Sequence, residues 1–346
     1  MPITRRTLGT ALGAAALAAP PTIAWAKDKL TVVMSSFDLL FWGTLSAKQL
    51  GYFDALDLDV EVVRANGGAR SLAAVAGGDA HFNIGAPVSA FRARSRGSDV
   101  MMIAPAVAQY IDNITMSGDW ARKNGLSATS PLEDRMKALK GMTVAVSSVG
   151  AGADQLLRFL SKKIGINPDR DMTITAIPGG ENMLAAMSRN RIDGFVIPPP
   201  TGEDAVRNHG AVPMITTGRG EITELNGFIY IGVIARESWL KQNRGITVRF
   251  LRATQQAFDT IHDPARTGTA RDAIWEGFQK RIDKAMFDEV WANAIPVYPK
   301  TVALERAMID RIVNFTNETL PEPLDARVAE SAWTNDFAAE ALARRA

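Results

Sequence analysis

The chain has 346 residues, of which 47% are hydrophobic and 22% are charged, and it contains no cysteine. These are ordinary values for a globular protein, and the length suits two lobes better than one compact core. Without cysteine the chain can form no disulfide, no thiolate nucleophile and no cysteine metal site.

The segment 1–26 has the pattern of an export signal. Arg5 and Arg6 precede a weakly apolar stretch that ends in Ala24-Trp25-Ala26, the small-x-small pattern that signal peptidase cuts. We predict a twin-arginine-like signal cleaved after Ala26, with an ordinary secretory signal as the alternative. Gly, Thr and a pair of prolines interrupt the stretch, which disfavours a membrane anchor. The mature chain is therefore expected in the periplasm, freely diffusing because no cysteine follows the signal.

Basic and acidic residues balance in the mature chain. Of the 39 basic and 37 acidic residues, two arginines and no acid lie in the predicted signal, which leaves a formally neutral protein. This balance gives no support for a nucleic-acid partner, because such proteins usually present a basic surface.

The chain from residue 29 to residue 87 predicts strand, helix, strand, helix and strand in that order. The evidence is apolar runs rich in β-branched residues alternating with segments whose apolar residues recur at helical spacing. The predicted elements are "KLTVVMSS" (29–36), "LLFWGTLSAKQLGYF" (39–53), "LDVEVVRA" (58–65), "GGARSLAAVAGG" (67–78) and "AHFNIGAP" (80–87).

The same order follows from residue 142 to residue 200. Its predicted elements are "MTVAVSS" (142–148), "ADQLLRFLSKKIG" (153–165), "MTITAIPGG" (172–180), "ENMLAAMSRN" (181–190) and "RIDGFVIPPP" (191–200). The register that places Thr31 on Thr143 superimposes three segments of the two units without a gap, including both Gly-Gly pairs and Pro87 on Pro199. Only the first helix slips in register. We therefore predict a duplicated βαβαβ unit with parallel strands and right-handed crossovers, in an α/β fold.

Candidate binding residues follow the strand ends of both units. In open α/β sheets, the carboxyl ends of the strands and the helix N-termini that follow face one edge, where ligands bind. Each unit then supplies half of a site in a cleft between two lobes. The candidates are Ser35, Ser36, Phe37, Asp38, Asn66, Gly67, Gly85, Ala86 and Pro87 in the first unit, Ser147, Ser148, Gly150, Ala151, Gly179 and Pro198 in the second, and Tyr110 between them.

The candidates point to an anion with an organic body, although other interpretations stay open. Ser147 and Ser148 precede a helix whose N-terminus would attract an anion, but the same residues would serve as a helix cap. Asp38 suits an anionic ligand only if it caps a helix or meets an N–H group. Phe37 and Tyr110 are expected at the cleft. Phe41 and Trp42 are expected in the core, and Asp112 and Asn113 at a hinge or rim or in a solvated loop.

The tail beyond residue 245 predicts amphipathic helices. Residues 249–261 and 304–320 place apolar side chains three and four apart, and "DPARTGTARD" (263–272) separates two helices. The expected role of these helices is to cover the core of the first lobe.

The sequence resembles the type II periplasmic substrate-binding proteins of ABC importers, in the nitrate, sulfonate and taurine branch that also includes binders of the thiamine pyrimidine precursor. The likeness extends over residues 29–260 and more loosely over the tail. It rests on "AKQLGYFDALDLDVEVV" (47–63), "GGARSLAAVAGGDAHFNIGAP" (67–87), "GMTVAVSSVGAGADQLLRFLSKKIGI" (141–166), "MLAAMSRNRIDGFVIPPP" (183–200) and "GVIARESWLKQN" (232–243).

The resemblance implies two lobes that close on a ligand about a two-segment hinge. The first lobe would comprise residues 27–108 and 229–346, the second residues 109–228, with crossovers near 104–114 and 225–235. It also implies a monomeric receptor that delivers a small organic anion, a sulfonate or a carboxylate and including aromatic ones, to a permease in the inner membrane. The alternatives are a neutral pyrimidine-type ligand, or a receptor that hands its ligand signal to a sensor protein.

Catalysis is not expected. The histidines His81, His209 and His262 are too scattered for a metal motif, and His81 at a strand start suits a structural role. The glycine pairs lack dinucleotide-binding spacing, and "SSVGAG" lacks the lysine of a phosphate-binding loop. In the resembled fold, the enzymes depend on cysteines that this chain lacks. We therefore predict no catalytic residue, no metal and no cofactor.

Overall fold

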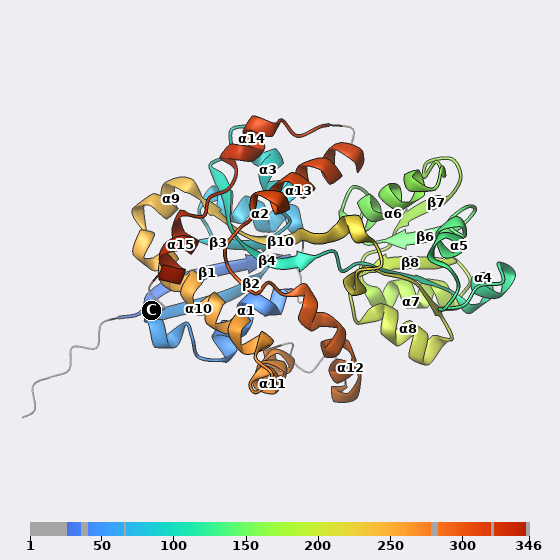
Figure 1. The fold of residues 1–346 in the computed structure, drawn as a ribbon, viewed down its shortest axis with the longest axis horizontal. Helices are drawn as coiled ribbons and strands as arrows, with labels where there is room; N and C mark the ends of the chain where they lie inside the picture. Colours follow the sequence, from blue (N-terminus) through green and yellow to red (C-terminus); the bar gives the residue numbers. More distant parts are fainter. Residues whose placement is uncertain (1–25, 36–40, 66, 278–282, 320–321, 344–346) are drawn as a thin grey trace, which may run out of the picture.

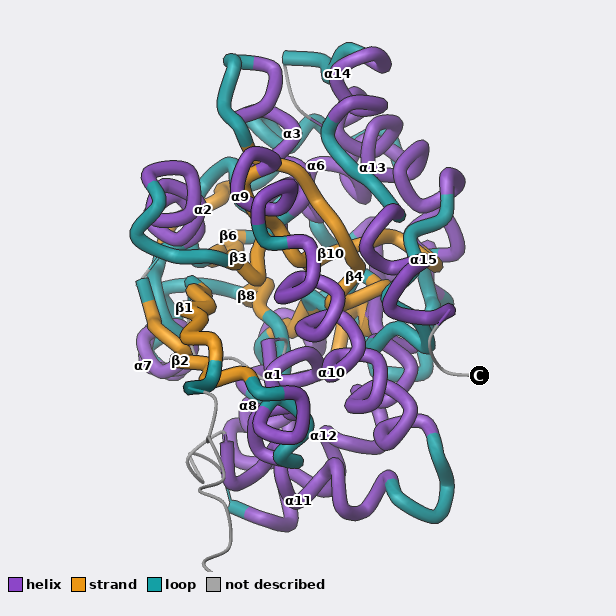
Figure 2. Tube along the Cα trace, turned by 90° about the vertical axis from the view of Figure 1, so that its left-hand side faces the viewer, coloured by secondary structure: helices purple, strands orange, loops and turns teal. Residues whose placement is uncertain are grey.

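The computed structural model describes residues 26–35, 41–65, 67–277, 283–319 and 322–343. Two five-stranded sheets form the centres of two lobes, and the chain passes between them along β4 and β10 (Figure 1). In the view turned by 90°, the strands lie in the middle of the molecule with helices around them (Figure 2). The molecule therefore has the two-lobed α/β architecture that the sequence predicts.

The sheet of the first lobe has the strand order β2-β1-β3-β10-β4. Strand β1 is parallel to β2 and β3, whereas β10 is antiparallel to both β3 and β4. Three helices follow the strands closely in sequence: α1, α2 and α3. The bounds are β1 Asp28–Met34, α1 Trp42–Gln49, β2 Leu58–Arg64, α2 Gly68–Gly77, β3 Phe82–Gly85, α3 Pro87–Ser95, β4 Val100–Gln109 and β10 Asn226–Arg236, with a short 3-10 helix η2 at Asp54–Leu56.

The sheet of the second lobe has the equivalent order β7-β6-β8-β5-β9. Here β6 is parallel to β7 and β8, and β5 is antiparallel to β8 and β9. The bounds are β5 Asn113–Met116, α4 Gly118–Lys123, α5 Leu132–Lys137, β6 Thr143–Val146, α6 Gly152–Lys163, β7 Thr173–Ala176, α7 Gly180–Ser188, β8 Gly194–Ile197, α8 Thr201–His209 and β9 Val212–Thr216.

The predicted duplication is present in the strand pairing. Val32 pairs with Phe82 in the first sheet, and Val144 pairs with Gly194 in the second, so that both partners keep the predicted register between the units. Strands β3 and β8 begin and end at equivalent positions in that register. The parallel pairing expected within the two units is confirmed for three strands of each lobe. The sheets are nevertheless mixed, because the strands from outside the repeat join them antiparallel.

Two short segments join the lobes. The first connects β4 to β5 at residues 110–112, inside the expected stretch. The second connects β9 to β10 at residues 217–225, through the 3-10 helices η3 (Thr217–Arg219) and η4 (Thr223–Leu225). It meets the expected stretch 225–235 at Leu225, and the rest of that stretch is strand β10, which pairs with β3 and β4. The lobe boundaries at 108 and 228 stay predictions.

The tail forms helices, as expected. Helix α10 packs against α1 and α15, and the chain breaks between α10 and α11 as predicted, although α11 already begins at Thr267, inside the expected segment 263–272. Helices α12 and α13 reach the second lobe, where they contact α8 and α6. The bounds are α9 Glu237–Gln242, α10 Arg244–His262, α11 Thr267–Gly277, α12 Lys284–Ala294, the 3-10 helix η5 Ile295–Val297, α13 Arg306–Thr319, α14 Ala326–Ser331 and α15 Asp336–Ala343.

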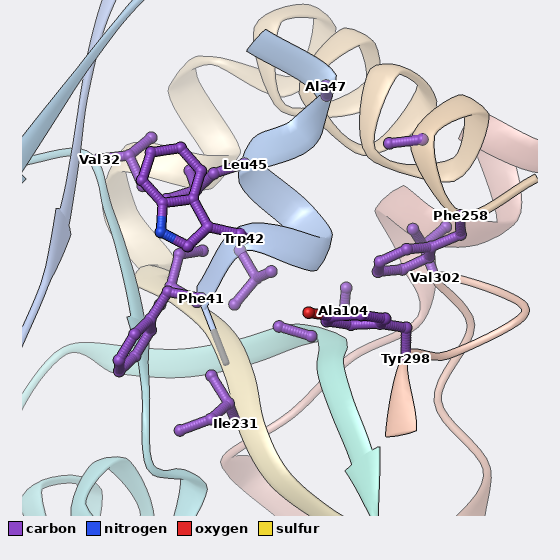
Figure 3. Packing of buried hydrophobic residues seen from close by; sticks show 14 of the residues in the cluster. Val32, Phe41, Trp42, Leu45, Ala47, Ala104, Ile231, Phe258, Tyr298 and Val302 are labelled. Atoms are coloured by element: carbon purple, nitrogen blue, oxygen red, sulfur yellow. The ribbon is translucent and has the colours of Figure 1, made fainter. Parts of the chain in front are cut away.

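Phe41 and Trp42 belong to the core of the first lobe, as predicted. Each is 4% exposed, and the cluster around them brings α1 together with strands β1, β4 and β10 and with the tail (Figure 3). Burying a side chain of this kind contributes about 1.5–3 kcal/mol. Among the described residues, no helix is both long and apolar enough to cross a membrane.

Candidate functional site

A cleft of about 760 Å³ lies between the lobes, lined by loops and helix N-termini from both repeats. Ten of the sixteen candidate residues line it. They are Ser35, Gly85, Ala86, Pro87, Tyr110, Ser147, Ser148, Gly150, Ala151 and Pro198. The topology accounts for this, since the strand ends of two equivalent sheets face each other across the crossovers.

The remaining six candidates divide into two groups. Gly67 and Gly179 lie outside the lining and precede α2 and α7 with φ of 147° and 87°, so their role is to form the turns. The other four lie outside the described residues. They are Ser36, Phe37, Asp38 and Asn66.

The N-terminus of α6 opens on the cleft without a serine cap. Its N-cap residue is Ala151 and no side chain caps the helix, whereas the N–H of Gly150 in the preceding loop donates to the Asp154 Oδ2 atom at 2.8 Å. Asp154 is 1% exposed and also accepts from the Arg158 Nε at 3.0 Å, which balances its charge. The N–H groups of Gly152, Ala153 and Asp154 have no acceptor among the described residues. These donors, together with the helix dipole, suit an anion.

Two tyrosines connect the crossovers to the cleft wall. The Tyr110 hydroxyl donates to the Gly152 carbonyl oxygen at 2.6 Å, and the Tyr230 hydroxyl donates to the Asp112 Oδ2 at 2.6 Å. Their ring centroids are 4.7 Å apart. Burial raises the pKa of Tyr110 well above its ordinary value, and the charges of Asp112 and Asp154 raise it further. Tyr110 is therefore a neutral phenol, 1% exposed, that ties the first crossover to α6.

Sequence reasoning missed the arginines of the cleft. Arg92 on α3 and Arg96 just after it line the cavity. The Arg92 Nη2 donates to the Glu322 carbonyl oxygen at 3.0 Å, whereas its buried Nε has no partner among the described residues. The available signal was the basic run "FRARSR" after the third strand, which the second unit does not contain.

Asp112 and Asn113 are buried where the first crossover enters β5, so a solvated loop is excluded for both, and their place at a hinge stays a prediction. Asp112 is 1% exposed and Asn113 is 8% exposed. Of the two, Asp112 lines the interlobe cleft, where its carboxylate accepts the Tyr230 hydroxyl. Tyr230 itself comes from β10 and was not among the candidates.

The histidines show no arrangement for metal binding. The His81 Nδ1 accepts the Thr31 N–H at 2.9 Å, and its ring lies at the edge of Trp239. Burial lowers the pKa of His81, and the charge of Arg236 lowers it further. These contacts are structural, as expected. Across the described parts of the chain, no group of three or more His, Asp or Glu residues is close enough to hold a metal ion.

A family model for the NMT1-like family matches residues 44–274. The chain belongs to the NMT1-like family. The match begins within α1 and ends within α11, so it includes both crossovers and every strand except β1. A search of curated proteins finds no match to the sequence.

Solved structures with this fold include binding proteins. A protein from Bordetella bronchiseptica RB50 superimposes with a TM-score of 0.74 at 18% identity, covering 92% of this chain and 98% of that one. The alkanesulfonate-binding protein SsuA from Xanthomonas axonopodis pv. citri, bound to MOPS, gives 0.68 at 16% identity, covering 90% and 99%. The periplasmic nitrate-binding protein NrtA from Synechocystis PCC 6803 gives 0.67 at 15% identity, covering 92% and 89%. The NMT1-like chain therefore has the fold of periplasmic ABC-type solute-binding proteins.

An enzyme shares the fold as well. A mutant of DSZB in complex with biphenyl-2-sulfinic acid superimposes with a TM-score of 0.66 at 14% identity, covering 92% of this chain and 100% of that one. The fold therefore does not decide between binding and catalysis, and the residues of the cleft must do so.

Proposed function

We propose that this NMT1-like protein is a periplasmic receptor that captures a small organic anion between its lobes and presents it to an ABC permease. The observation that carries the proposal is the cleft itself, which is lined by the strand ends of both repeats. A ligand in this position touches both lobes, so it would favour the arrangement in which they are close.

The polar groups of the cleft favour an anion. The open N–H groups at the start of α6 and the guanidinium of Arg92 are donors, and both suit a sulfonate or a carboxylate. Asp112 also lines the cleft, but its carboxylate already accepts a hydrogen bond from the Tyr230 hydroxyl. SsuA, which binds alkanesulfonates, and NrtA, which binds nitrate, share the fold and support an anionic ligand here.

The apolar part of the lining favours an organic body over a bare ion. Phe41, Leu72, Phe228 and Ile231 line the same cavity as the donors. A volume of about 760 Å³ is also far larger than nitrate requires. We therefore propose a sulfonate or carboxylate with an aliphatic or aromatic portion.

A thermal-shift screen tests the proposal. The protein, first stripped of any co-purified solute, is heated with sulfonates, aromatic carboxylates, nitrate, amino acids and pyrimidines in turn. A ligand at about 100 times its dissociation constant adds roughly 2.7 kcal/mol to the free energy of unfolding. Stabilisation by sulfonates or carboxylates supports the proposal. Stabilisation by pyrimidines alone would replace the anion with the neutral alternative, and chemical conversion of the stabilising compound, detected by mass spectrometry, would indicate an enzyme.

The cellular location is part of the proposal and has its own test. Expression in a Gram-negative host, followed by fractionation and measurement of the intact mass, should give periplasmic protein that begins at Lys27. Substituting Arg5 and Arg6 by lysine should leave the full-length chain in the cytoplasm if export uses the twin-arginine route. Normal export of that variant would point to the general secretory route instead.

A further inference from the structure

A second cavity of about 250 Å³ lies on the hinge side of the second lobe and shares no lining residue with the interlobe cleft. Its walls come from β5, β9 and α8 of the second lobe, and from α12 and η5 of the tail. Figure 1 shows α8 and α12 next to each other below the crossovers. A molecule in this cavity would contact the second lobe and the tail at a place separate from the cleft.

Two buried acceptors in this cavity lack a donor. Asn113 is 8% exposed, and its Nδ2 donates to the Glu203 Oε1 at 3.3 Å. This contact orients the amide, because turning it over would set its oxygen against the carboxylate. The Asn113 Oδ1 and the Glu203 Oε2 then remain buried without a partner among the described residues. Buried acceptors of this kind destabilise the protein unless something donates to them.

The charged side chains around the cavity balance, with two arginines and two glutamates, so the two unpaired acceptors decide which ligand fits. Arg207 on α8 is paired with Glu289 on α12, and this ion pair closes one side of the cavity. Arg219 lies exposed at the rim. Desolvation raises the pKa of Glu203 and the charge of Glu289 raises it further, whereas the backbone N–H of Glu203, the charge of Arg219 and the Asn113 amide lower it, with a net increase. The carboxylate is therefore held in a place where a positive neighbour would stabilise its charged form.

We propose that the hinge-side cavity binds a small cation with several N–H donors, of the ammonium or guanidinium class, with Glu203 and Asn113 as its acceptors. The apolar side chains Val206 and Val297, which also line the cavity, would contact the aliphatic part of such a ligand. An anion would face two unpaired acceptors. The two acceptors also fall short of the ligand number that metal ions require.

The test uses isothermal titration calorimetry of the full chain with methylguanidinium chloride, against sodium chloride at equal ionic strength. We expect saturable binding with one site per chain. Glu203→Gln removes the charge, and Val206→Phe fills the cavity from a side chain that is 40% exposed and can change without disturbing the core. Both variants should bind at least tenfold more weakly. Val63→Phe is the matched control, since Val63 is 38% exposed and lies far from the cavity on β2, and it should bind as the parent does.

The same experiment shows at which site the cation binds and whether the cavity accepts cations or anions. Ser148→Trp blocks the interlobe cleft, so methylguanidinium binding should survive in that variant. Loss of binding in Ser148→Trp would place the cation in the cleft and overturn the proposal, while leaving the proposed receptor function intact. No saturable binding, or equal binding by the Glu203→Gln and Val206→Phe variants, would also overturn it. Saturable acetate binding that requires Arg219 would assign the cavity to anions instead.

The pH dependence adds a second readout. A cation needs the ionised form of Glu203, whose pKa is raised by burial. The affinity of the parent protein for methylguanidinium should therefore increase as the pH rises through that pKa. Glu289, Arg207 and Arg219 are the other charged groups that face the cavity, and Glu203→Gln leaves all three in place. Its residual binding should be independent of pH over the same range, and an identical pH profile in both proteins would contradict the role of Glu203.

Discussion

Ser148 lies exposed in the loop before α6 and lines the cleft, so a large side chain at this position would enter the space that a ligand needs. We expect Ser148→Trp to abolish the stabilisation by whichever ligand the screen identifies, with the circular dichroism spectrum and the ligand-free unfolding midpoint unchanged. Ser188→Trp, on the exposed face of α7, is the control and should keep the ligand effect. If Ser148→Trp binds as tightly as the parent, this loop does not belong to the site.

Arg92 tests the sign of the ligand charge. Arg92 lines the cleft, and its buried Nε has no partner among the described residues. A hydrogen bond to a charged group contributes about 1.5–3 kcal/mol, so Arg92→Ala should weaken anion binding by roughly that amount. Arg92→Lys should recover part of the loss through its charge alone. The control Arg189→Ala removes an exposed arginine elsewhere in the second lobe and should change nothing. Tighter anion binding by Arg92→Ala would contradict the proposed ligand class.

Glu203 makes a prediction about stability that needs no ligand. Desolvation raises its pKa in the folded protein above the ordinary value of 4.5. In the pH window between these two values, the folded state holds a proton that the unfolded state has lost, so this residue makes stability fall as the pH rises. Glu203→Gln should remove that fall, which urea unfolding at several pH values would detect. Glu181→Gln, on exposed α7, is the control and should retain it. A parallel pH profile for parent and Glu203→Gln would contradict a buried, destabilised carboxylate.

Helix α6 approaches the crossover strand β10 closely, and Gly152 permits the contact. A Cβ atom at Gly152 would lie 2.7 Å from the Tyr230 hydroxyl and 3.0 Å from its ring. Gly152→Ala must therefore displace Tyr230 and its hydrogen bond to Asp112, at an expected cost of about 1–3 kcal/mol in the free energy of unfolding. Gly245 near the start of α10 has nothing within 4 Å of such a Cβ, and Gly245→Ala should be neutral or stabilising by up to about 1 kcal/mol. Equal effects of the two substitutions in denaturant titrations would contradict the close approach.

The repeated elements could be predicted from the sequence because their signals are local. Each repeated element has its own apolar period. The register that places Thr31 on Thr143 also aligns the elements of the two copies, including the first and last residues of β3 and β8. Strands β5 and β10 belong to neither copy, and their antiparallel partners lie far away in the sequence. Their pairing depends on tertiary packing, which a local pattern does not contain, and this is why the repeat does not predict the antiparallel strands that make the sheets mixed.

The candidate site divides in the same way. Loops such as Ser147-Ser148 and Ala86-Pro87 were predictable because strand direction alone brings them to the cleft edge. Arg92 and Tyr230 were not, because they reach the cleft from a helix outside the repeat and from the long crossover strand. The turn glycines Gly67 and Gly179 follow the same strand-end rule yet lie outside the lining, since the rule locates a loop and not the atoms that it exposes.

At the scale of the whole molecule, the chain passes between the lobes through a packed aromatic interior. Tyr110, Phe228 and Phe315 pack with ring centroids 5.1 to 5.5 Å apart, and Phe159 of α6 joins Phe315 at 5.3 Å. The aromatic side chains therefore come from the first crossover, from β10, from the tail and from the second lobe. If the lobes close on a ligand as proposed, this cluster has to rearrange, so contacts at its edges would bias the relative positions of the lobes.

The two cavities are therefore expected to be energetically coupled. The size of the hinge-side cavity depends on the separation of α8 from α12. The size of the cleft depends on the positions of the same two lobes. Ligands that bridge the walls of either cavity select one common state, so each should increase the affinity for the other. Coupling energies of this kind are about 1–3 kcal/mol, or roughly 5- to 150-fold in affinity.

Calorimetric titration of the cleft ligand, with and without saturating methylguanidinium, measures this coupling. We expect tighter binding of the cleft ligand in its presence, and the reverse titration must give the same factor because linkage is reciprocal. Val206→Phe, which fills the hinge-side cavity, should remove the effect, whereas Val63→Phe should keep it. If methylguanidinium binds but leaves the affinity of the cleft for its ligand unchanged, the two cavities are not coupled. The aromatic cluster would then not link the positions of the two lobes.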